Sequence, residues 1–185
     1  MNGHSLAAFI TKTFGINYRI TPSGGPIDWD VVDDYVRRLM LEEGEITKLT
    51  VQVSVFLDDA NMIAAYFDSG CGIFCDAFWR DIALYKSYHV LTVVLAHKCM
   101  LTCPESFCDN LFEVSPKRRC WEVGEDWEAE MIRTEQCIRI LFGSGVVLPE
   151  GYPMTSLVQR LKYKATSQYY RDLIDISVGN PLQLD

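Results

Sequence analysis

The chain has 185 residues, of which 49% are hydrophobic and 23% are charged, a balance typical of one globular domain with a single buried core. We therefore expect one domain over 1–185, made of an N-terminal helix and arm (1–27), an α+β core (28–154), and a C-terminal helix and tail (155–185). The formal net charge of −8 excludes a protein that coats nucleic acid over its whole surface, because neutralising phosphates requires a general excess of Lys and Arg.

Targeting signals are not recognisable in the sequence. The first residues, MNGHSLAAFITKTFG, lack the long apolar core of a secretory signal. The longest apolar run, 90–96, is far shorter than the roughly 20 residues that a membrane span needs. Seven cysteines, an odd number, favour reduced thiols over a disulfide framework. We expect a cytoplasmic protein.

The first predicted element is a short amphipathic helix over 6–14. Ser5 can cap its start, and Gly15 can end it in a left-handed conformation. So short a helix is marginal alone and needs a partner surface to cover its apolar face. We therefore predict a self-association site on this face, formed by Leu6, Phe9, Ile10 and Phe14.

A stronger helix and a strand follow. The segment 29–43 has helical apolar spacing, with Asp28 or Asp30 as its cap and Gly44 as its stop. In KLTVQVSVFL (48–57), apolar and other residues alternate, which predicts a half-buried strand. The core face of that strand would hold Leu49, Val51, Val53, Val55 and Leu57.

The middle of the chain is predicted as strand, helical crossover, strand. Two aspartates, Asp58 and Asp59, can cap a helix over 60–68, and a second helix is expected over 73–86. The apolar, Val-rich run 88–97 predicts another strand. The expected fold class is α+β, with amphipathic helices at both ends of the chain.

The C-terminal third gives weaker patterns. Residues 115–123 are typical of an edge strand, and 126–142 fit a helix or two short strands equally well. Glycines and prolines predict a loop over 143–153. A last helix is expected over 156–176, capped by Thr155 or Ser156, with one apolar face made of Leu157, Leu161, Ala165, Tyr169, Leu173 and Ile176.

A histidine and three cysteines within 96–112 raise the question of a metal site. His97, Cys99, Cys103 and Cys108 are zinc-compatible ligands, so a zinc-stabilised binding module is one alternative. On a strand, successive side chains point to opposite faces, and the rest of the set would need a tight turn at Pro104. We favour buried thiols without zinc. Cys71 and Cys75 are separated by three residues rather than the two of a redox pair.

One stretch resembles an enzyme motif. The sequence lacks a phosphate-binding loop, HExxH and G-x-S-x-G. VSVFLDDANM (53–62) resembles the first motif of NYN/PIN-type ribonucleases, which would make Asp58 a metal-binding carboxylate oriented by Asn61. This metal-dependent ribonuclease is the second alternative. We favour helix capping by Asp58 and Asp59, and expect no enzyme activity and no cofactor.

Basic residues form two clusters on an acidic chain. The first comprises Lys117, Arg118 and Arg119, and the second Arg160, Lys162 and Lys164. Such clusters can hold phosphate or acidic lipid headgroups locally. We predict binding at these six residues.

The central pattern of TVQVSVFL, AAYFDSGCGIFCDAFWRDIALYK and YHVLTVVLAHKCML resembles the core of rhabdovirus-type matrix proteins. The resemblance implies a small mixed β-sheet with helices packed on one face. The lysine-rich tail and proline-tyrosine motif of animal-virus members are not found, so a plant- or arthropod-virus variant fits better. The resemblance implies a non-enzymatic virion protein of the host cytoplasm that self-associates and bridges viral nucleoprotein or ribonucleoprotein to an anionic membrane. It implies no sequence-specific nucleic-acid binding.

Overall fold

The computed structural model describes residues 54–55, 58–68, 76–114 and 127–179. In these ranges the chain forms seven helices: α4 (Ala60–Asp68), α5 (Asp76–Tyr85), α6 (Tyr88–Ala96), α7 (Pro104–Leu111), α9 (Trp127–Gly143), α10 (Met154–Lys164) and α11 (Gln168–Gly179). Several predicted elements lie outside the described residues: the helices over 6–14 and 29–43, the edge strand over 115–123, and most of the strand over 48–57.

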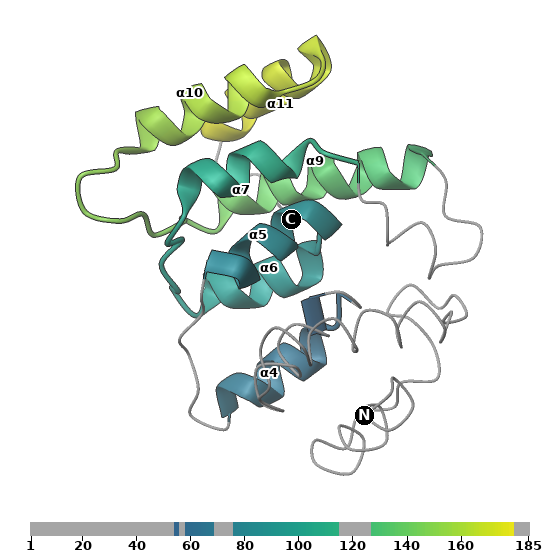
Figure 1. The fold of residues 1–185 in the computed structure, drawn as a ribbon, viewed down its shortest axis with the longest axis vertical. Helices are drawn as coiled ribbons and strands as arrows, with labels where there is room; N and C mark the ends of the chain where they lie inside the picture. Colours follow the sequence, from purple (N-terminus) through teal and green to yellow (C-terminus); the bar gives the residue numbers. More distant parts are fainter. Residues whose placement is uncertain (1–53, 56–57, 69–75, 115–126, 180–185) are drawn as a thin grey trace.

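The helices are stacked along the long axis of the molecule (Figure 1). The pair α10 and α11 lies at one end, α4 lies at the other, and the remaining helices lie between them. Contacts follow the same order, because α4 packs on α6, α6 on α9, α5 on α7, α10 on α7 and α11 on α9.

The predicted α+β fold is wrong for the described residues, which contain helices and no strand or sheet. Their extended pairing is limited to one isolated parallel bridge between Met100 and Val147, in which the Leu101 N–H donates to the Val147 carbonyl over 2.9 Å. The small mixed sheet is therefore replaced by packed helices.

The segment predicted as the second central strand forms helix α6. Its β-branched residues favour a strand by propensity, but that preference spans only about 1 kcal/mol and is readily overridden by packing. Val90, Leu91, Val94 and Leu95 are buried, a spacing that places all four on one side of a helix. The strand prediction failed because a short apolar run fits both structures.

The end of the predicted first strand is also helical. Ser54 and Val55 have helical backbone, and their carbonyls accept hydrogen bonds from the Asp59 and Asp58 N–H groups over 2.9 and 3.1 Å. Both side chains are fully buried, so the expected alternation between a buried and an exposed face does not hold at these two positions. The core prediction for Val55 is confirmed, while its strand assignment is wrong.

Three other helices agree with the sequence. Helix α4 covers 60–68 as predicted, and the Asp59 carboxylate caps it by accepting the Asn61 and Met62 N–H groups over 3.0 and 3.2 Å. Helix α5 falls within the predicted 73–86. For 126–142 the structure decides between the two alternatives, because α9 is one continuous helix.

The predicted last helix is two helices, α10 and α11. Ala165 has an extended ψ of 128°, and the Ser167 hydroxyl accepts the Tyr170 N–H over 3.4 Å, which starts α11. Helix α10 begins after Pro153 with no side-chain cap, so the predicted caps Thr155 and Ser156 are wrong. The break lets α10 pack on α7 while α11 packs on α9.

The break also changes the buried face. Leu157, Leu161, Ala165 and Leu173 are buried as predicted. Tyr169 and Ile176 are 51% and 62% exposed, and Tyr170 and Ile174 are buried in their place. A single straight helix of 21 residues would have had to keep one face throughout.

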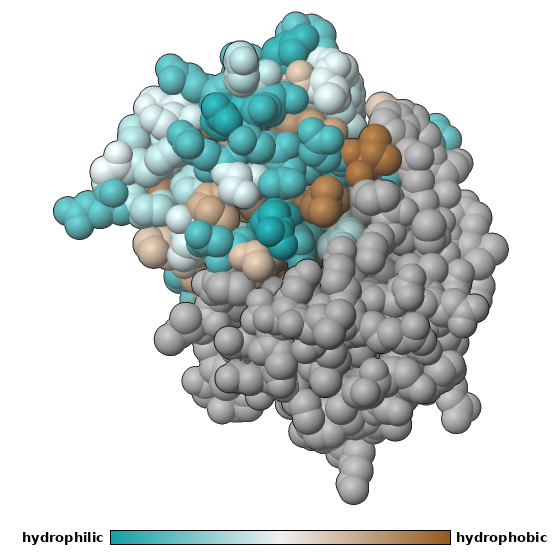
Figure 2. Space-filling model, viewed as in Figure 1, coloured by the Kyte–Doolittle hydropathy of each residue, from teal (hydrophilic) through white to brown (hydrophobic). Residues whose placement is uncertain are grey.

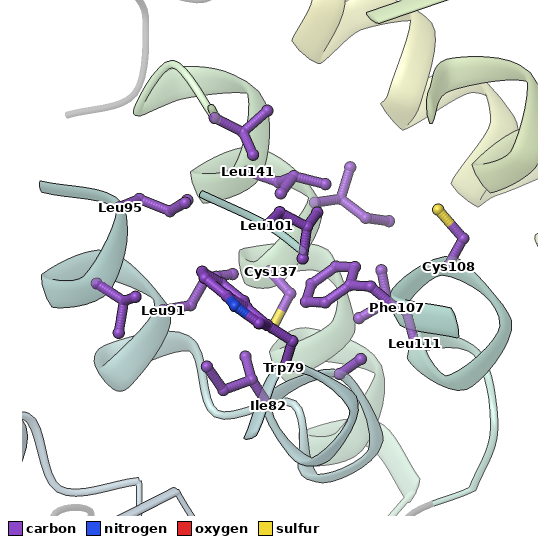
Figure 3. Packing of buried hydrophobic residues seen from close by; sticks show 14 of the residues in the cluster. Trp79, Ile82, Leu91, Leu95, Leu101, Phe107, Cys108, Leu111, Cys137 and Leu141 are labelled. Carbon is purple, nitrogen blue, oxygen red and sulfur yellow. The ribbon is translucent and has the colours of Figure 1, made fainter. Parts of the chain in front are cut away.

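The core lies where α5, α6, α7 and α9 meet (Figure 3). Trp79 and Phe107 lie near its centre, with the Cys137 side chain next to them. Cys108, on α7, points away from this centre toward the C-terminal helix pair. All four residues are essentially inaccessible to solvent. None of the helices in the described ranges has the length and apolar character needed to cross a bilayer.

Candidate binding site

A pocket lies where the end of α7, the first half of α9 and the start of α11 come together. Its volume is about 300 Å³, at the lower end of the range of small-molecule sites. It is lined by Lys86, Phe112, Glu113, Val114, Glu130, Met131, Thr134, Thr166, Ser167 and Tyr170. On the face drawn in Figure 2, hydrophilic and intermediate residues (teal and white) cover most of α10 and α11. Hydrophobic residues (brown) gather nearer the level of α7 and α9.

Lys86 is the most unusual residue of the pocket. It follows α5 with a φ of +52°, in the left-handed region that favours glycine, and it is only 2% exposed. A lysine is rarely buried, and a left-handed backbone costs a residue with a side chain about 1–2 kcal/mol. The position therefore needs a compensating interaction.

The ammonium group of Lys86 supplies that interaction by joining three parts of the fold. It donates to the Leu84 carbonyl over 3.1 Å and to the Glu113 carbonyl, and it lies 3.7 Å from Glu130 Oε1. The Leu84 carbonyl lies in the last turn of α5, and the Glu113 carbonyl lies two residues after the end of α7. The dipole at a helix C-terminus favours a nearby cation. Lys86 thus fixes the relative positions of α5, α7 and α9.

Aromatic and hydroxyl groups form the rest of the pocket wall. The rings of Phe112 and Tyr170 are in contact, with centroids 5.4 Å apart. Burial raises the pKa of Tyr170, and a hydrogen bond with the Thr134 side chain opposes that shift. The Thr134 hydroxyl also donates to the Glu130 carbonyl over 3.1 Å. The wall is therefore preformed.

The charges of the pocket do not cancel. Glu113 and Glu130 contribute two carboxylates, and Lys86 contributes one ammonium group. The Glu113 side chain is exposed, whereas Glu130 is 6% exposed beside Lys86. The described lining residues consequently carry a formal charge of −1, and the exposed acidic residue among them is Glu113.

The suspected catalytic residue Asp58 holds a helix end. Its carboxylate accepts the Val90 N–H over 3.0 Å and contacts His89 Nδ1 at 2.7 Å. Val90 is in the first turn of α6, so Asp58 caps α6, while its neighbour Asp59 caps α4. The Asn61 N–H donates to Asp59 rather than to Asp58.

The four suspected zinc ligands occupy different environments. His97 is exposed, stacks on Phe67 with ring centroids 3.9 Å apart, and contacts the Val93 carbonyl through Nδ1 at 2.9 Å. Cys99 and Cys103 are half-buried. Cys108 is fully buried, and burial raises its pKa to about 12. No group of three or more metal-binding side chains occurs among the residues that the structure describes.

The second basic cluster is paired with acids. Arg160 binds Asp109 on α7 through two hydrogen bonds of 2.8 Å, and this guanidinium lowers the pKa of Asp109. Lys164 lies 3.9 Å from the same carboxylate, and Lys162 binds Asp175 on α11 over 2.9 Å. These cations hold α10 against its neighbours, which leaves less positive charge for an anionic partner than the sequence suggests.

Other predicted site residues lie outside the described ranges. These are the self-association residues Leu6, Phe9, Ile10 and Phe14, the basic residues Lys117, Arg118 and Arg119, and the cysteine pair Cys71 and Cys75. The pocket as a whole has no local signature in the sequence, because its described lining comes from four separate segments. The one local signal was a lysine placed where a helix end would normally have glycine.

No protein-family model, no curated protein and no solved structure matches this chain. Its function must therefore be argued from its own side chains.

Proposed function

We propose that the protein is a non-enzymatic binding module that takes a side chain of a partner protein into the pocket at Lys86 and Glu130. The observation that carries this proposal is the pocket itself, a preformed hollow of about 300 Å³ walled by Phe112, Met131 and Tyr170. Clefts with apolar walls and a few fixed polar groups are typical binding sites.

The chemistry of the reactive groups supports binding over catalysis. Asp58 is engaged with α6 and His89, and the Lys86 ammonium is engaged with two carbonyls and Glu130. The Cys108 thiol, with a pKa of about 12, is a poor nucleophile because the thiolate is the reactive form. In the described part of the chain these groups stabilise the fold.

The more specific matrix-like function remains a prediction. Its resemblance rested on a strand-helix-strand pattern, and the described part of that pattern forms α4, α5 and α6. Self-association, a ribonucleoprotein partner, an anionic membrane and a virion location are therefore not part of this proposal. What it retains is the coarser function of a protein that acts through contacts with other proteins.

Selection of peptides from a random library displayed on their encoding RNA tests the proposal. Thr166→Trp fills the pocket from its rim, because Thr166 is exposed and lines it. Thr155→Trp, at an exposed position of α10 away from the pocket, is the matched control.

We expect selected peptides to bind the parent and Thr155→Trp equally, and to bind Thr166→Trp at least about tenfold more weakly, since tenfold is only about 1.4 kcal/mol. Equal binding to all three proteins, or the absence of any enriched peptide, would exclude the pocket as the binding site.

A further inference from the structure

The pocket described above combines apolar walls with a net negative charge, and this combination defines what it can hold. Building on the proposed function, we infer that the occupant is a basic side chain of the partner, an alkyl stem that ends in an ammonium or guanidinium group. The inference deepens that proposal by naming the chemistry of the bound group.

The stem would be held by apolar surface. Phe112, Val114 and Met131 all line the pocket, and the last two are 44% and 37% exposed. Lysine and arginine bury their methylene groups along such surface while the charged head stays in a polar environment. An apolar rim beside a carboxylate therefore matches both halves of these side chains.

The charged head would be held by Glu113. This side chain is exposed, lines the pocket and forms no ion pair within the described part of the chain. The Lys86 ammonium already binds backbone carbonyls and Glu130 on the protein side. A second cation arriving from solvent would therefore bring the formal charge of the described lining residues from −1 to zero.

The aromatic pair adds a second reason. The Phe112 and Tyr170 rings, tilted by 54° with centroids 5.4 Å apart, both reach the pocket. Aromatic faces attract cations within about 6 Å of the ring centre, arginine more often than lysine. The net charge of −8 adds long-range attraction for a basic partner and repulsion between two copies of this chain.

Two other occupants fit less well. An anionic group would meet Glu113 and Glu130 in the same small space, and like charges there disfavour binding. A second copy of the chain would approach against its own net negative charge. Both remain as outcomes that the test can detect.

Four small probes of similar size separate these cases: n-butylguanidinium, n-pentylammonium, neutral 1-pentanol and anionic pentanoate. Each is titrated into the isotope-labelled full-length parent, and the backbone amide shifts of Glu113, Met131 and Ser167 are followed by NMR. Glu113→Gln removes the proposed partner charge at an exposed position, and Glu150→Gln, also exposed but away from the pocket, is its matched control.

We expect the two cations to shift these resonances and to bind more tightly than pentanol. Glu113→Gln should weaken cation binding about two- to fivefold, the range of a partly exposed ion pair, and Glu150→Gln should leave it unchanged. Equal affinity for pentanol and the cations, with no effect of Glu113→Gln, would overturn the inference and leave the binding pocket standing.

Tighter binding of pentanoate would also overturn the inference, in favour of an anionic occupant. If no probe shifts the pocket resonances, the inference fails, and the peptide selection then decides separately whether the proposed function fails as well. Concentration-dependent association of the parent that Thr166→Trp abolishes would identify a second copy as the occupant and contradict a basic partner.

Discussion

Lys86 shows how one residue can join several helices at a local cost. Its left-handed backbone and burial are unfavourable alone, and its bonds to the ends of α5 and α7 and its ion pair with α9 offset them. The sequence could place this lysine near a helix end. It could not show the three acceptors, because two of them come from residues 27 and 44 positions further along the chain.

The first prediction concerns this lysine. Lys86→Met keeps a long side chain but removes the ammonium from Glu130 and two carbonyls, and should lower the free energy of unfolding by about 3 kcal/mol, as removal of one partner of a buried pair does. Urea unfolding measures this change. Lys98→Met is the control, because Lys98 also has a left-handed φ, +57°, but is exposed.

The control should change stability by less than about 0.5 kcal/mol. Glu130→Gln should destabilise the Lys86→Met variant less than it destabilises the parent. In that variant the Glu130 carboxylate is already without its ammonium partner, so neutralising it removes an unbalanced buried charge. Equal stability of Lys86→Met and the parent would show that the ammonium contributes nothing.

Cys108 gives a prediction on pH. Its pKa rises from 9.0 to about 12 in the folded protein, chiefly through burial, so between these values the unfolded chain loses a proton that the folded chain keeps. The stabilisation is fully present below pH 9 and is lost as the pH rises toward 12, by about 1.4 kcal/mol per unit. Cys108→Ala should remove this part of the slope.

Urea unfolding of the parent and Cys108→Ala from about pH 8 to about pH 10 measures the difference between slopes. The absolute stability of the variant also changes, because a small cavity is created, but a cavity has no pH dependence. Parallel slopes would show that the thiol titrates normally and is accessible to water.

At the scale of elements, local patterns predicted α4 and α5 and failed at α6. The first two have amphipathic spacing, and Asp59 caps α4 within its own segment. Helix α6 receives its cap from Asp58, more than 30 residues earlier. Because this capping residue is distant in the sequence, the residues beside α6 do not indicate where a helix begins. The Val-rich sequence of α6 therefore led to the prediction of a strand.

The third prediction tests this remote cap. Asp58→Ala should cost about 2 kcal/mol, since it removes the cap and places alanine at a φ of +53°. Asp58→Asn should cost less, because asparagine keeps an acceptor and tolerates this conformation better. Asp59→Ala is the matched comparison, because it removes the cap of α4.

Hydrogen exchange locates the effects. Asp58→Ala should speed exchange at the Val90 and Leu91 amides, and Asp59→Ala should speed exchange at Asn61 and Met62. Acceleration at the same amides in both variants would mean that the two aspartates do not cap separate helices.

At the scale of the whole molecule, the sequence predicted one apolar core but not its architecture. Val55, Leu157 and Leu161 were placed in the core correctly. The sheet was wrong because a short apolar run cannot distinguish a buried helix from a strand, and only packing against α4 and α9 decides it. The pocket could not be predicted for the same reason, since its walls meet only after α7, α9 and α11 have packed.

The location at which a selected peptide binds tests the central claim most directly. A peptide enriched against the parent is added to the isotope-labelled protein, and the backbone amides whose NMR shifts change are mapped on the fold. We predict that the largest changes fall at 112–114, 130–134 and 166–170, and that Thr166→Trp abolishes them. Largest changes on the exposed face of α10 around Tyr163, retained in Thr166→Trp, would contradict the claim that this protein acts through the pocket.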